Sequence, residues 1–281
     1  MFKRFIPITL CLTAAFLLAA CSKEGDSQKL VASAKQAQDK GDLKAAVIEL
    51  KNALQKNPEN AEARAQLGKL YLKQGDPASA EKELRKAMQL GKDKNELLPE
   101  LGQAMLQQGQ IQKVIDEIQV PASAAPLLRA RLLALQGNAY MSLKQHDKAK
   151  ASLEAARTLA PDLADVYAGL AVLAMVEQKD TEASAHIDTA IAKDPQRAAT
   201  WLMKGYWLQT KDKLDEAIVA YQEALKADPR SIQAHSSLAN IYMKQGKLDA
   251  ARAEIAAIKK IEHQHLEGKY LTALIDFQQK N

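Results

Sequence analysis

A repeat of about 34 residues is the feature of this sequence that most limits how the chain can fold. Small residues mark the repeat and recur at intervals of 34 or 35, at Ala34, Gly68, Gly102, Gly137, Ala171, Gly205, Ala239 and Ala273. A column made mostly of alanine follows twelve residues later, at Ala46, Ala80, Val114, Ala149, Ala183, Ala217 and Ala251. Bulky apolar residues stand four positions further on, at Leu50, Leu84, Ile118, Leu153, Ile187, Tyr221 and Ile255. This spacing predicts tandem units, each of which buries its apolar face against its neighbours.

Each unit is expected to be a pair of helices joined by a short turn. The small side chains let the two helices approach closely, and the bulky column fills the space between units. Glycines mark the expected turn at Gly41, Gly75, Gly109 and Gly246. Prolines, which disfavour helix in the residue before them, are expected to end the second helix at Pro58, Pro126, Pro161, Pro195 and Pro229. The pattern resembles the tetratricopeptide repeat, a helix-turn-helix unit of 34 residues.

We therefore predict an all-α fold, an α-solenoid of tandem tetratricopeptide helix-turn-helix repeats that forms a right-handed superhelix. Seven units are expected over residues 28–263, and a C-terminal helix, either a cap or a truncated eighth unit, over residues 264–281. The third unit is the weakest, because Val114 and Pro121 stand where alanine is expected. One extra residue in this unit predicts an irregular joint over residues 120–127.

The first 20 residues have the pattern of a secretory signal, with Lys3 and Arg4 followed by an apolar run to Ala20. That run contains a proline and is short for a spanning helix, which needs about 20 apolar residues. It ends in LAAC, which resembles the bacterial lipobox, in which the cysteine is acylated. We therefore predict a lipoprotein signal peptide at residues 1–20, lipid attachment at Cys21 and a polar tether up to residue 27. Ser22 implies, by resemblance to lipoproteins of diderm bacteria, a lipid-anchored protein on the periplasmic face of the outer membrane.

Composition and motifs argue against several classes of function. The formal net charge is only +5, and the basic residues alternate with acids, so the chain lacks the footprint of a nucleic-acid-binding protein. Cys11 lies in the predicted signal peptide, which leaves Cys21 without a disulfide partner. His263 and His265 lie close enough to share a metal ion, but no carboxylate or thiol with ligand spacing accompanies them. Since no phosphate loop or nucleophile elbow is found either, we expect a binding protein without metal or cofactor, and not an enzyme.

The expected partner is another protein or peptide, bound on the concave face that the first helices of the units form. Counting one and four residues past the small column predicts the lining of this groove as Asn138, Met141, Val172, Met175, Tyr206, Gln209, Asn240 and Met243. Asparagine can hydrogen-bond a peptide backbone, and methionine adapts to varied apolar side chains. For each of these residues, solvated helix surface is the alternative. Trp201 is expected to pack in the core, and the role of Trp207 is left open.

A closer resemblance combines the lipobox and the tether with two stretches of the repeats. They are LKNALQKNPENAEARAQLGKLYLKQGDPASAEKELRKAMQLG at residues 50–91 and VIDEI at residues 114–118. Together these features are similar to the PEP-CTERM system TPR-repeat lipoprotein family, as its N-terminal part or as a shortened member. The resemblance implies a scaffold in exosortase-linked protein sorting and exopolysaccharide export, and it carries over only Cys21 as a functional residue. A type IV pilus or secretin assembly lipoprotein, which shares the lipobox and the repeats, is the alternative.

Overall fold

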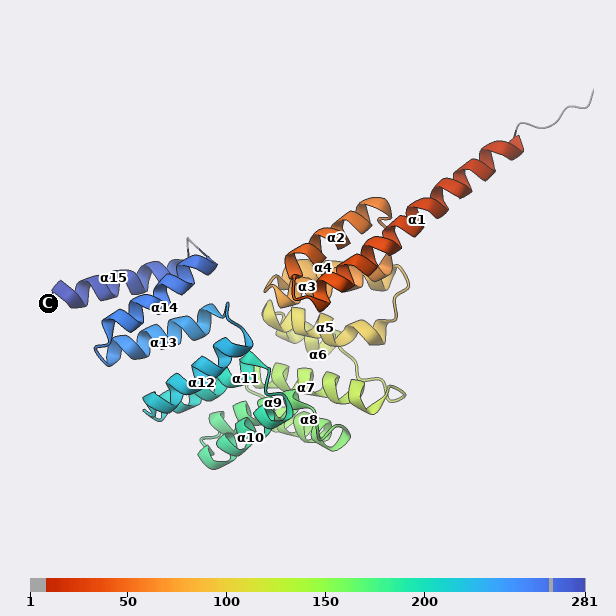
Figure 1. Cartoon of the computed structure of the whole chain (residues 1–281). Helices are drawn as coiled ribbons and strands as arrows, with labels where there is room; N and C mark the ends of the chain where they lie inside the picture. The colour runs from red at the N-terminus through yellow and green to blue at the C-terminus, as the bar shows by residue number, and fades with distance from the viewer. Residues whose placement is uncertain (1–8, 263–264, 281) are drawn as a thin grey trace, which may run out of the picture. The chain divides into compact units, whose positions relative to one another are not determined.

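The computed structural model describes the backbone of residues 9–262 and 265–280, and these residues form fifteen helices and no strand (Figure 1). Side chains are described for residues 24–262, 265, 266 and 268–275. The predicted all-α fold of tandem helix pairs is confirmed. Among the described residues, no helix combines the length and the apolar character needed to cross a membrane.

The chain divides into two compact bodies, Met1–Lys144 and Gln145–Asn281. The N-terminal body contains α1 (Thr9–Asp39), α2 (Leu43–Lys56), α3 (Ala61–Lys73), α4 (Pro77–Gln89), α5 (Lys94–Gln107), α6 (Ile111–Glu117) and α7 (Pro126–Ser142). The C-terminal body contains α8 (His146–Leu159), α9 (Ala164–Val176), α10 (Asp180–Lys193), α11 (Ala198–Thr210), α12 (Leu214–Ala227), α13 (Ile232–Lys244), α14 (Leu248–Ile261) and α15 (Leu266–Lys280). The order of helices follows the predicted pairs.

The small column lets the two helices of a pair come into close contact. A Cβ atom added to Gly68 in α3 would lie 2.7 Å from Cγ of Leu84 in α4. A Cβ atom added to Gly205 in α11 would lie 2.6 Å from Cε1 of Tyr221 in α12. The alanine column is buried as well, and Ala46 has no exposed surface. The close approach of the paired helices therefore depends on the absence or small size of these side chains.

The turn within each helix pair has one residue with a left-handed backbone. The four glycines predicted for this turn have φ between +71° and +78°, which confirms the prediction. In the other three pairs the same position is occupied by Lys144, Gln178 and Asp212, with φ between +56° and +59°. The left-handed conformation is unfavourable for a residue with a Cβ atom, so the repeat geometry imposes it even where glycine is missing.

A recurring hydrogen bond fixes the chain between successive pairs. The side chains of Arg64, Tyr167, Trp201 and His235 each reach the carbonyl oxygen of the proline six residues earlier. In one of them, Nε1 of Trp201 donates to the carbonyl of Pro195 at 2.9 Å. Trp201 also packs at the edge of the core around Tyr221, which confirms its predicted structural role.

The third pair is irregular, as the sequence predicts. Its second helix, α6, has seven residues, and residues 118–125 are not helical. Pro126 departs from the expectation, because it is the first residue of α7 and does not end the helix before it. This position suits proline, since the first N–H groups of a helix have no partner within the helix.

The predicted polar tether is not an extended linker. Residues 21–27 lie inside α1, which extends past the end of α2 (Figure 1). Ser27 has no exposed surface and belongs to the packed part of the first helix pair. Burial of a single polar side chain such as Ser27 is missed by a search for apolar stripes.

The C-terminal helix α15 packs on the last helix pair. Leu271 and Ile275 of α15 are buried in a cluster with Ile255 and Ile258 of α14. Helix α14 ends at Ile261 and α15 begins at Leu266, and His263 and Gln264 between them lie outside the described residues. His265 is described and is half-buried.

Candidate functional site

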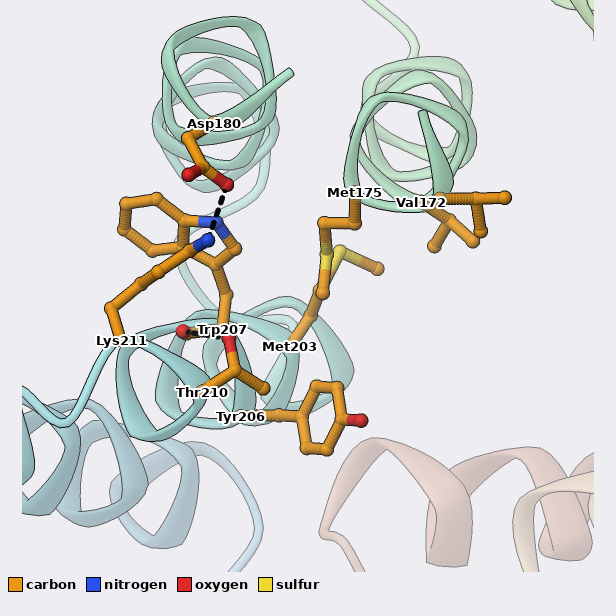
Figure 2. Close-up of a pocket in the computed structure, with 9 residues that line it drawn as sticks. Val172, Met175, Asp180, Met203, Tyr206, Trp207, Thr210 and Lys211 are labelled. Atoms are coloured by element: carbon orange, nitrogen blue, oxygen red, sulfur yellow. Dashed lines mark hydrogen bonds and ion pairs between the residues drawn. The ribbon is translucent and has the colours of Figure 1, made fainter. Parts of the chain in front are cut away.

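A cavity of about 470 Å³ opens between α9 and α11 of the C-terminal body (Figure 2). Nine residues line this α9–α11 pocket: Val172, Met175, Val176, Asp180, Met203, Tyr206, Trp207, Thr210 and Lys211. The two helices are the first helices of successive pairs, so the pocket lies between neighbouring repeats. Its volume is in the range of sites that hold a small ligand or a few side chains.

The wall and floor of the pocket are apolar. In Figure 2 the side chains of Met175 and Met203 extend toward each other from facing helices, and Tyr206 lies below them. Three large apolar side chains of the pocket are exposed, Val172 by 36 %, Val176 by 51 % and Tyr206 by 58 %. Exposed apolar residues are ordinary when scattered, but here they share one concave place. The α9–α11 pocket therefore offers apolar surface that a ligand can bury.

Polar groups are gathered at one end of the pocket. Nζ of Lys211 lies 2.6 Å from a carboxylate oxygen of Asp180, and this ion pair joins α10 to the end of α11. The hydroxyl of Thr210 donates to the carbonyl of Trp207 at 2.7 Å. Nε1 of Trp207 is buried and has no hydrogen-bond partner among the described residues. A buried donor without an acceptor is uncommon in proteins, so this N–H is available to a ligand that reaches it.

The first helices of the N-terminal body have a different, charged surface. Lys92 lies 2.7 Å from Glu62 of α3 and 3.1 Å from Glu96 of α5. Burial opposes ionisation of Glu62, but the hydrogen bonds from Lys92 and Gln66 outweigh it and hold its pKa below the ordinary value. The same bonds to Glu62 and Glu96 raise the pKa of Lys92. These ion pairs connect successive repeats.

A comparison with protein families finds the tetratricopeptide repeat at residues 37–97, 140–204 and 209–275, which together cover well over half of the chain. The chain belongs to the tetratricopeptide repeat family. No curated protein matches it. The tetratricopeptide repeat (TPR) is a scaffold for protein-protein interaction, and this coarse function therefore applies to the chain.

Solved structures with the same fold are distant in sequence. A tetratricopeptide repeat protein from Parabacteroides merdae has a TM-score of 0.60 at 16 % identity, over 89 % of this chain and 99 % of that one. A chain of the Cut9–Hcn1 hetero-tetramer of APC/C has a TM-score of 0.56 at 17 % identity, over 92 % of this chain and 48 % of that one. An IFIT1 monomeric mutant with m7Gppp-AAAA has a TM-score of 0.64 at 16 % identity, over 82 % of this chain and 57 % of that one. At these identities the likeness shows the TPR fold alone.

The structure brings three of the predicted groove residues together. Val172, Met175 and Tyr206 line the α9–α11 pocket. Gln209 lies on the same helix as Tyr206, but its Oε1 accepts a hydrogen bond from the Tyr221 hydroxyl at 3.0 Å. Its amide oxygen is therefore already engaged within the TPR pair.

The other four predicted residues lie elsewhere. Asn138 and Met141 are half-buried residues of α7, in the N-terminal body, whereas Asn240 is exposed on α13. Met243 is only 8 % exposed and belongs to the core formed by α13, α14 and α15. Its assignment to the groove is wrong, because α15 packs against α13 and covers this position.

Sequence reasoning missed most of the pocket. Six lining residues were not predicted: Val176, Asp180, Met203, Trp207, Thr210 and Lys211. A signal was present in α11, since Met203, Tyr206, Trp207 and Thr210 follow the i, i+3, i+4, i+7 spacing of one helix face. Counting only one and four residues past the small column selected Tyr206 from this face of α11 and missed the other three residues.

Metal binding finds no support within the described part of the chain. No three His, Cys, Asp or Glu side chains gather there in a way that could hold an ion. The histidine pair considered from the sequence includes His263, which lies outside the described residues.

Proposed function

We propose that this protein is a lipid-anchored TPR scaffold of the periplasm, and that the α9–α11 pocket binds an apolar side chain of a partner protein. The observation that carries the proposal is the joint exposure of Val172, Val176 and Tyr206 around two adaptable methionines. Methionine is unbranched and polarizable, so a pocket built on Met175 and Met203 accepts apolar side chains of several shapes. The function is binding and not catalysis.

The size of the pocket limits the contribution of this site to affinity. Burying one large apolar side chain contributes about 1.5 to 3 kcal/mol, which corresponds to about a 10- to 150-fold change in affinity. One such contact does not hold a partner by itself. We therefore expect the partner segment to contact neighbouring repeats of the C-terminal body as well, for example through Asn240, which is exposed on α13.

Site-specific photo-crosslinking in cells tests the pocket. A photoreactive residue replaces Tyr206 in one variant and Val219 in the other. Val219 is the matched control, because it is 56 % exposed but lies on α12, outside the pocket. The proposal requires a protein captured at position 206 and not at position 219. The purified partner should bind the double variant Met203→Ala, Tyr206→Ala at least tenfold more weakly and should bind Val219→Ala with unchanged affinity. Equal capture at the two positions, or unchanged affinity for the double variant, would refute the proposal that the α9–α11 pocket binds the partner.

The identity of the captured protein distinguishes the two pathways. We propose exopolysaccharide export and exosortase-linked sorting, which the resemblance of residues 50–91 supports. Recovery of components of that system is the expected result. Recovery of pilus or secretin proteins would instead favour the assembly lipoprotein.

Lipid attachment is a separate part of the proposal. It rests on the LAAC sequence that ends at Cys21, and the outer membrane is the proposed location. Intact-mass analysis should show a chain that begins at Cys21 and carries acyl groups. Two or three acyl chains give stable anchoring, so the Cys21→Ser protein should leave the membrane fraction. An unmodified mass, or a membrane-bound Cys21→Ser protein, would refute this part.

A further inference from the structure

The start of the predicted mature chain is fixed to the first helix pair by a partly buried polar cluster. We name this cluster, made of Glu24, Ser27, Asn57 and Asn60, the N-terminal clamp. The hydroxyl of Ser27 donates to the carbonyl of Ala53 at 2.9 Å and accepts from Nδ2 of Asn60 at 2.8 Å. Asn57 donates to the Glu24 carboxylate through Nδ2. The clamp thus ties α1 to the end of α2 and to the start of α3.

The clamp cannot open without leaving buried polar groups unpaired. Ser27 has no exposed surface and Asn60 is 7 % exposed. Asn60 is also the N-cap of α3, since its Oδ1 accepts from the backbone N–H of Ala63 at 2.9 Å. Just past Ser27 along α1, Leu30, Val31 and Ala34 pack in the core of the first pair. Residues 24–27 are therefore part of the folded body and do not act as a flexible linker.

From this geometry we infer that the α2–α3 loop, residues 57–60, is the surface of the N-terminal body that lies against the lipid bilayer. Only Ser22 and Lys23 separate Cys21 from Glu24. Three Cα–Cα steps span at most about 11 Å even when fully extended, and about 4.5 Å in a helix. Acyl chains on Cys21 thus hold the backbone of Glu24 within that distance of the bilayer surface, and Asn57, whose side chain bonds to Glu24, lies next to it. The inference rests on the proposed acylation of Cys21.

The opposite end of the first pair can lie much further from the membrane. The α1–α2 turn at Lys40 lies 16 residues beyond Glu24 along the same helix, a distance of about 24 Å. The inference therefore places the α2–α3 loop at the bilayer and the α1–α2 turn further into the periplasm.

Fluorescence quenching in vesicles tests this orientation. The full lipidated protein is prepared as Glu59→Cys and as Lys40→Cys, where the new thiol is the only free one because Cys21 is acylated and Cys11 leaves with the signal peptide. Each variant is labelled with a small fluorophore and placed in vesicles of phosphatidylethanolamine and phosphatidylglycerol with a nitroxide quencher on the headgroup. We expect quenching at position 59 to exceed that at position 40 by severalfold. Equal quenching at the two positions would overturn the inference.

Three further variants test whether the clamp is the cause. Twelve Gly and Ser residues inserted after Lys23 leave the clamp intact but lengthen the linker, and should abolish the difference in quenching. Ser27→Ala should reduce it, whereas Ser33→Ala, on the exposed side of the same helix, should not. A difference that survives the insertion would overturn the inference. Intact mass separates the two proposals, since a protein without acyl groups refutes the anchor, and an acylated protein with equal quenching refutes the orientation alone.

Discussion

Adding one methyl group at Gly205 is a sharp test of how the TPR pairs are packed. In α11 the new Cβ of Gly205→Ala would lie 2.6, 2.7 and 2.8 Å from three ring atoms of Tyr221. The ring has little room to move, because Tyr221 is 2 % exposed and its hydroxyl bonds to Gln209. Overpacking costs about 1 to 3 kcal/mol, and alanine recovers up to about 1 kcal/mol of helix propensity. We expect a net loss of about 1 to 2 kcal/mol.

The assay uses a probe that the sequence places on the same helix. The two tryptophans, Trp201 and Trp207, both belong to α11, so their fluorescence follows local unfolding of this pair in urea. With an m-value of about 2 kcal/mol/M, the midpoint should fall by about 0.5 to 1 M. In a repeat protein each repeat contacts only its neighbours, so the effect should centre on this pair.

Two controls separate the contact with Tyr221 from a general effect of the substitution. Tyr221→Leu removes the ring, so it should make Gly205→Ala less costly in the double variant than in the single one. Gly25→Ala, in α1, meets no atom within 4 Å, so circular dichroism should show no loss of stability. An unchanged urea midpoint for Gly205→Ala would refute the packing argument. So would additive effects of Gly205→Ala and Tyr221→Leu in the double variant.

Gly75→Ala should destabilise the chain by about 1 kcal/mol in urea unfolding, because φ is +77° there; no loss would contradict the strain. The pKa of Glu62 is lowered in the folded state from 4.5, so its contribution is present above that pH and lost as pH falls through the lower folded pKa. The free energy of unfolding, measured as a function of pH, should therefore decrease below about pH 4.5, and it should decrease less in Glu62→Gln. The same pH dependence in Glu62→Gln and the wild type would count against the ion pair with Lys92. Trp201→Phe should cost about 1 kcal/mol through the lost bond to Pro195, measured by thermal unfolding, and a neutral result would exclude that bond as a stabilising contact.

The repeat could be read from the sequence because its requirements are local. A glycine at the turn adopts the left-handed backbone that the turn needs, and Gly41 and Gly75 have it. The alanine and glycine columns are set by the contact between two helices that are adjacent in the chain. Such contacts depend on residues about twelve to sixteen positions apart, so each unit repeats the same solution and the period becomes visible.

The candidate site could be predicted only in part, because it depends on contacts between repeats. Met175 and Met243 occupy the same position of the repeat, four residues past the small column. Met175 lines the α9–α11 pocket, whereas Met243 is buried where α15 packs against α13. No local pattern distinguishes these two methionines, since the difference lies in how closely the next first helix packs.

The sequence by itself thus determined the helix pairs, their turns and the column of small residues, because each follows from the conformation and size of a few nearby side chains. The tertiary structure decided which apolar residues remain exposed in the α9–α11 pocket, and that the polar start of α1 is fixed by the N-terminal clamp. Both features join helices from different repeats, and the space between repeats depends on many side chains at once. From the sequence alone, the short polar segment 24–27 has the composition of a linker. Only the tertiary structure shows that Ser27 bonds to Ala53 and Asn60, which lie about 30 residues further along the chain.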